Sequence, residues 1–121
     1  MTDLLITTFF ITHGLVHLAI YATPANPDKP APLDPGRSWA LSGVTTTWTR
    51  GASVALACAV AATYSAAGFM VAIEAPTAAA VAGLAAVLGL VLKGLWFHPW
   101  LTLGVALDIV VAVAAVQGWP A

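Results

Sequence analysis

The sequence predicts an all-α fold: an integral membrane four-helix bundle with a proline-rich loop and an interfacial segment between its first two helices. Two observations support this prediction. Of the 121 residues, 60% are hydrophobic and only 7% are charged, whereas a soluble domain of this size needs many charged side chains to solvate its surface. In addition, four separate apolar stretches reach the ~20 helical residues that cross a bilayer core of ~30 Å.

The four predicted spans form one domain, residues 1–121. They run from about residue 4 to 23, 51 to 73, 76 to 97 and 99 to 118. The first is followed by Pro24, and the third begins at Pro76, a residue type that suits a first helical turn. Because short turns join the last three spans, we expect these helices to be antiparallel neighbours. A signal peptide begins with a positively charged region, but the residues before the first span include Asp3 and no basic residue. We therefore expect this span to be a helix of the mature protein.

The connection between the first two spans holds five of the eight prolines, at positions 24, 27, 30, 32 and 35. Residues 24–35 are predicted to be polyproline-like coil, because each proline fixes φ and lacks a backbone donor. Residues 37–48 are mildly apolar and are predicted to lie at the headgroups as the interfacial segment.

The basic residues predict the orientation of the chain. With four spans, the first and third connections share one side of the membrane, and both termini share the other side with the second connection. All the basic residues belong to the first side: Lys29, Arg37, Arg50 and Lys93. Because short cytoplasmic loops are enriched in Lys and Arg, this segregation predicts both termini outside. Lys93, near the end of its span, is expected to snorkel to the cytoplasmic headgroups.

Aromatic residues agree with this orientation. Tryptophan is enriched at membrane interfaces, and four tryptophans are predicted to anchor the cytoplasmic one: Trp39, Trp48, Trp96 and Trp100. Small residues follow two stripes on the second span. One stripe holds Gly51, Ala55 and Ala59, and the other Ala57, Ala61 and Ser65. Such stripes are typical of helix contacts in lipid, either within the chain or with a partner.

Three polar residues in the spans form the candidate site. His13 and His17 are four residues apart and share one face of the first span. Asp108 in the last span lies at the depth of His13, each roughly 13 Å inside the cytoplasmic end of its helix. A carboxylate at that depth needs a partner. We therefore predict a structural polar pair, His13 and Asp108.

Two further interpretations of this site remain open. His13, His17 and Asp108 could hold a metal ion or a haem, because histidines at i and i+4 can share one ion. Zinc hydrolases with two histidines at this spacing carry a glutamate after the first histidine. Gly14 stands at that position here, so a zinc hydrolase is excluded. Alternatively, the same three residues could relay protons or a polar substrate.

Other function classes find no support in the sequence. The net charge of −1 gives no clustered basic face for nucleic acid. A single cysteine, Cys58, cannot form an intramolecular disulfide or a redox pair, and as a small residue in an apolar run it is expected to be packing. With no nucleophile–base pair or phosphate loop, we predict no enzyme, no catalytic residue and no cofactor.

Two short motifs, HGLVH at 13–17 and WFHPW at 96–100, in an Ala/Val/Gly-rich four-span chain look like small membrane proteins of high-GC bacteria. In size and topology the chain is similar to the DoxX-like four-helix proteins, although the arginine expected in their first helix is absent. It is also similar to the small accessory subunits of envelope machines such as Mce-type lipid importers. This resemblance implies an accessory role in the bacterial inner membrane.

The expected function is therefore a non-enzymatic accessory or assembly subunit of a larger inner-membrane complex, such as a lipid transporter, with the bilayer and other membrane subunits as its partners. The alternative is a small self-contained transporter or a metal or redox membrane protein that uses His13, His17 and Asp108.

Overall fold

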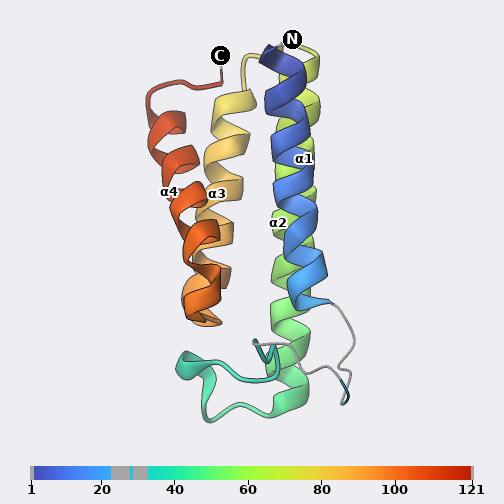
Figure 1. Ribbon diagram of the computed structural model, residues 1–121, viewed down its shortest axis with the longest axis vertical. Helices are drawn as coiled ribbons and strands as arrows, with labels where there is room; N and C mark the ends of the chain where they lie inside the picture. The colour runs from blue at the N-terminus through green and yellow to red at the C-terminus, as the bar shows by residue number, and fades with distance from the viewer. Residues whose placement is uncertain (1, 23–27, 29–32, 121) are drawn as a thin grey trace.

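The computed structural model describes residues 2–22, 28 and 33–120 (Figure 1). Within these residues every regular element is helical. The elements are α1 (Thr2–Tyr21), η1 (Trp39–Leu41), α2 (Thr46–Ala72), α3 (Ala78–Leu95), η2 (Pro99–Leu101) and α4 (Thr102–Val116). Each of the helices α1, α2 and α3 is long and apolar enough to cross a membrane, and so is α4 together with η2. They run alternately in opposite directions, so α1 begins at the end of the bundle where α4 finishes (Figure 1).

The second helix starts earlier than the sequence analysis predicts. The side chain of Thr45 accepts a hydrogen bond from the backbone N–H of Trp48 at 3.5 Å and caps α2. The predicted interfacial segment, residues 37–48, therefore divides into the short turn η1 and the first turn of α2. The predicted polyproline-like coil at 24–35 falls mostly outside the described residues, and so does Lys29.

A tight turn reverses the chain between α2 and α3. Glu74 has a φ of 56°, in the left-handed region, and its N–H donates to the carbonyl of Val71 at 3.0 Å. The N–H of Ala75 donates to the carbonyl of Met70 at 2.8 Å, which satisfies another carbonyl of the last turn of α2. α3 then starts at Ala78, just after Pro76, rather than at the proline itself.

Consecutive helices pack closely, α1 on α2, α2 on α3 and α3 on α4. Between α1 and α2 the approach depends on glycine. A Cβ at Gly14 would lie 2.7 Å from the Cβ of Tyr64, and one at Gly68 would lie 3.1 Å from the carbonyl oxygen of Thr7. The hydroxyl of Thr7 donates to the Gly68 carbonyl at 3.1 Å. By contrast, α1 and α4 meet chiefly through side chains.

The two small-residue stripes of α2 have different surroundings. Ala57 and Ala61 are buried against the other helices, so this stripe is an internal contact. Gly51, Ala55 and Ala59 are exposed. Cys58, expected to be packing, also lies exposed.

Much of the outer surface is apolar. In α4 the buried residues are Asp108 and Val111, and the helix exposes large hydrophobic side chains around them: Leu103, Ile109, Val110, Val113 and Val116. α1 likewise exposes Leu4, Leu5, Leu15 and Val16. A helix that is apolar on its outer as well as its inner side is typical of a lipid environment.

Three of the four predicted interface tryptophans are on the surface. Trp39, Trp48 and Trp100 are 74%, 75% and 62% exposed. The prediction is wrong for Trp96, which is 2% exposed. Its side chain turns inward at the end of α3, and the segment before η1 covers it, because its indole N–H donates to the carbonyl of Pro35 at 3.0 Å.

Replacing Gly14 by alanine tests the α1–α2 contact. The new methyl group would collide with the backbone-anchored Cβ of Tyr64, and overpacking of this kind typically destabilises by about 1–3 kcal/mol. We expect a lower free energy of unfolding for Gly14→Ala, measured by circular dichroism during denaturation in one detergent. Gly51→Ala is the matched control: nothing lies within 4 Å of its Cβ position, and alanine favours the helix by up to ~1 kcal/mol. Equal stability of the two variants would contradict the packing described.

Candidate functional site, a buried ionic cluster

Five polar side chains meet inside the bundle, and every helix contributes at least one of them. They are His13 and His17 from α1, Tyr64 from α2, Lys93 from α3 and Asp108 from α4, together called the ionic cluster below. His13 is 9% exposed and each of the others is 2% exposed or less. Ionised groups are almost never buried this completely unless they are paired, so their contacts decide what the cluster can do.

Asp108 is the centre of the cluster. Its Oδ1 lies 2.8 Å from His13 Nε2 and accepts the hydroxyl of Tyr64 at 2.5 Å. Its Oδ2 accepts a hydrogen bond from Lys93 Nζ at 2.5 Å, which makes a buried ion pair. Because a carboxylate oxygen only accepts, His13 presents a protonated Nε2 to it. One carboxylate therefore binds side chains from all three other helices.

His17 joins the cluster through Lys93. Its Nδ1 lies 2.8 Å from the backbone carbonyl oxygen of His13, and because a carbonyl can only accept, this nitrogen carries a proton. Its Nε2 lies 2.5 Å from Lys93 Nζ. Since the ammonium only donates, Nε2 presents a lone pair, and the contacts assign His17 as a neutral imidazole. The ammonium thus lies between a neutral imidazole and a carboxylate.

Ring contacts hold the histidines in these orientations. The ring of Phe9 stacks on that of His13 with centroids 5.4 Å apart and an interplanar angle of 11°. Tyr64 packs edge-on against His13, with centroids 4.9 Å apart, and stacks at 6.0 Å on His17. The side chains are fixed by packing as well as by hydrogen bonds.

Glycines make room for the polar side chains. A Cβ at Gly89 would lie 2.5 Å from Asp108 Oδ2, and one at Gly104 would lie 2.8 Å from Lys93 Cε. Glycine in a helix interior is less favourable than alanine by about 1 kcal/mol. At these two positions the space that glycine leaves is filled by the ion pair.

The structure brings His13, His17 and Asp108 together, and it adds two residues. The expectation for Lys93 is wrong: it does not snorkel to the surface but is 2% exposed and paired with Asp108. The physical reason is that the buried carboxylate supplies a counter-charge and Gly104 leaves room for the aliphatic stem. Tyr64 is missing from the predicted site. The sequence signal for Tyr64 was a large hydroxylated side chain that stands between Ala61 and Ser65 of the small-residue stripe.

The burial of Lys93 changes the charge argument for orientation. Its charge is neutralised within the bundle by Asp108, so it no longer marks a membrane surface. Arg37 and Arg50 remain on the same side, and their side chains are 88% and 40% exposed. Among the described residues, the exposed basic side chains therefore lie at one end of the bundle.

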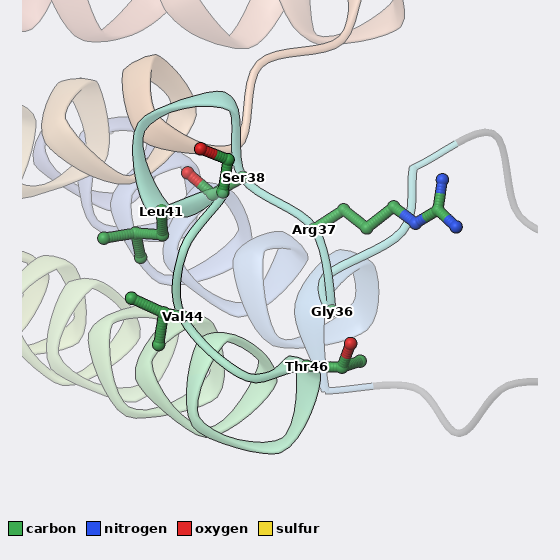
Figure 2. Close-up of a pocket in the computed structure, with 7 residues that line it drawn as sticks. Gly36, Arg37, Ser38, Leu41, Val44 and Thr46 are labelled. Carbon is green, nitrogen blue, oxygen red and sulfur yellow. The ribbon is translucent and has the colours of Figure 1, made fainter.

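A cavity lies beside the N-terminal end of α2, away from the ionic cluster (Figure 2). This cavity of about 310 Å³ is lined by Gly36, Arg37, Ser38, Leu41, Ser42, Val44 and Thr46. Figure 2 shows the Arg37 side chain pointing away from the cavity, and Asp34 lies 3.7 Å from it and 3.3 Å from Arg50. The cavity thus offers backbone and hydroxyl groups but no ionised side chain aimed into it, and the ionic cluster remains the candidate site.

Fold and site together define a compact four-helix protein of membrane-spanning dimensions with an ion-paired core. Comparison with protein-family models, with curated proteins and with solved structures finds no match to this chain. The resemblance to DoxX-like proteins and to accessory subunits of lipid importers therefore stays a prediction.

The ion pair predicts a characteristic mutational pattern. Asp108→Asn leaves the Lys93 charge buried without a counter-ion, and removal of one partner of a buried pair typically destabilises by about 3–5 kcal/mol. Lys93→Met should also be destabilising, because it leaves the Asp108 carboxylate buried without a counter-ion. The double variant removes both charges, so we expect its free energy of unfolding, measured by denaturation in detergent, to exceed that of either single variant.

The exposed ion pairs of Asp34 provide the control. Asp34→Asn should change stability by less than about 1 kcal/mol, because exposed ion pairs contribute little. If the losses of the two single cluster variants simply added in the double variant, the buried ion pair would be contradicted.

Proposed function

We propose that this chain is a multi-pass protein of a bacterial inner membrane and acts as a non-enzymatic accessory or assembly subunit of a larger membrane complex. The observation that carries the proposal is the ionic cluster, in which the Asp108 carboxylate is bound by one side chain from each of the other three helices. Such a cluster holds a bundle in one arrangement and keeps its outer faces in a constant relation.

The contacts of the cluster favour a structural role over a substrate site. Both carboxylate oxygens are already hydrogen-bonded, and both nitrogens of His17 have partners. Buried polar networks of this kind rigidify and specify a core when their members are satisfied. The arrangement binds helices to one another and does not present a free polar group to a bound substrate.

The outer faces supply the surface that a subunit needs. The exposed stripe of Gly51, Ala55 and Ala59 on α2 would let a partner helix approach the backbone closely, which is how helices associate in lipid. At the end of the bundle near η1, Trp39 and Trp48 are largely exposed. We propose that a partner helix packs on the α2 stripe, and a lipid-transport complex is one such assembly.

The orientation that we propose places both termini outside and residues 33–45 in the cytoplasm, because the exposed Arg37 and Arg50 lie at that end of the bundle. In a Cys58→Ser background, a cysteine at the exposed Ser42 should react with an impermeant thiol reagent only after the cells are opened. A cysteine at the exposed Thr77 should react in intact cells. The reverse pattern of labelling would overturn the orientation.

The accessory role predicts a partner. When the chain is isolated from native membranes in mild detergent, we expect one or more other integral membrane proteins to co-purify in a fixed ratio. Ala59→Leu places a bulky side chain on the exposed stripe and keeps a partner helix at a distance. It should therefore abolish this co-purification while the chain stays folded. Val110→Leu, at a position 64% exposed on α4, adds volume elsewhere and should leave it intact. Isolation of the native chain alone would count against the accessory role.

One observation favours a second candidate function. His13, Asp108, Lys93 and His17 form a continuous series of hydrogen-bonded, protonatable groups, and such groups in membranes mark proton relays. In proteoliposomes that enclose a pH-sensitive dye, proton flux that disappears in folded Asp108→Asn protein would favour a small transporter. Equal flux in native protein, the variant and empty vesicles would exclude it.

A further inference from the structure

We propose that His13, His17 and Asp108 form a latent transition-metal site, and that the Lys93 ammonium occupies the position of its cation. One ligand atom from each of the three residues lies within 4.8 Å of the other two. Lys93 Nζ contacts two of these residues, at 2.5 Å from His17 Nε2 and 2.5 Å from Asp108 Oδ2. Divalent metal and ammonium therefore compete for one place.

The donor set suits a borderline metal such as Zn²⁺. Imidazole nitrogen and carboxylate oxygen bind zinc at about 2.0–2.2 Å, so the ligands of a tetrahedral site lie roughly 3.4 Å apart. Side-chain shifts of about 1 Å would bring these three atoms to that separation. Two of the ligands, His17 Nε2 and Asp108 Oδ2, already direct lone pairs at a cation, because each accepts a hydrogen bond from the ammonium.

His13 needs one change to become the third ligand. Its Nε2 now donates to Asp108 Oδ1 at 2.8 Å, so its proton must move to Nδ1 before Nε2 can bind a metal. At 9% exposure it is the least buried member of the cluster. Proton exchange would take place at this most exposed residue, and a water molecule would supply the fourth ligand, as in other three-ligand zinc sites.

Charge decides when the metal can bind. A divalent ion beside the Lys93 ammonium would place three positive charges next to one carboxylate in a buried site, and uncompensated buried charge is strongly unfavourable. Lys93 must therefore leave as the metal enters. It lies in the last turn of α3, which ends at Leu95, so its flexible stem can carry the ammonium out to the end of the bundle. Metal binding and exposure of Lys93 are one coupled event.

The test uses Lys93→Met, which keeps the length of the side chain and removes the competing cation. Purified without a histidine tag, this variant should bind one Zn²⁺ or Co²⁺ per chain, at least about 100-fold more tightly than the native protein. Bound Co²⁺ should show the strong visible absorption of tetrahedral coordination, and Zn²⁺ should raise the melting temperature of the variant. Lys93→Arg, which keeps the positive charge, should bind no better than the native protein.

Two controls locate the metal. Lys93→Met combined with His17→Asn should lose the bound metal, and Lys93→Met combined with His98→Ala should keep it, because His98 lies at the N-terminus of η2 and outside the cluster. If folded Lys93→Met protein binds no stoichiometric metal, or binds it equally well without His17, the proposal is overturned.

A measurement on the native chain covers the case in which Lys93→Met does not fold. The sequence holds two lysines, Lys29 and Lys93, so mass spectrometry after acylation reports each separately. Without metal, the buried Lys93 should react slowly. Excess Zn²⁺ should increase its acylation at least about tenfold, since metal binding expels the ammonium, and Asp108→Asn should remove this zinc dependence. Acylation of Lys93 that is unaffected by Zn²⁺ would overturn the proposal.

Discussion

The ion pair between Lys93 and Asp108 is the interaction on which the arrangement of this bundle depends. Consecutive helices pack closely, but α1 and α4 are joined by side chains, above all by the contact between His13 and Asp108. Without the ammonium, the carboxylate would be a buried charge with only neutral donors, and without the carboxylate, Lys93 would be a buried cation without a counter-ion. A buried ion pair contributes little net stability compared with apolar packing, so we infer that its effect here is specificity, the selection of one arrangement of the helices.

The glycines show how the sequence accommodates that pair. Gly89 and Gly104 leave space for Asp108 and Lys93, and Gly14 lets α1 approach Tyr64. In helices this rich in alanine, a glycine in place of an alanine leaves space for a polar side chain of the neighbouring helix. The outer faces carry no comparable constraint, and there α1 and α4 expose leucine, isoleucine and valine. A polar cluster inside and large apolar side chains outside are typical of helices that pack together in a bilayer.

The three roles proposed for the cluster, a clasp, a proton relay and a latent metal site, differ in what Lys93 does. In a clasp the ammonium stays between His17 and Asp108. In a relay it exchanges a proton with its neighbours without leaving. In the metal-bound form it moves to the end of the bundle. Accessibility of this one side chain therefore distinguishes the metal-bound form from the other two, because Lys93 leaves the cluster only in that form.

The sequence by itself determined the number and approximate position of the helices, because span length and hydropathy are local properties that neighbouring helices do not alter. It also placed His13 and Asp108 at one depth, which follows from counting residues along a helix. Only the tertiary structure decided that Lys93 is buried, that Tyr64 completes the cluster and that Trp96 turns inward. Those outcomes depend on which helix faces meet and on the space beside glycines of another helix, and the pattern of a single span contains neither.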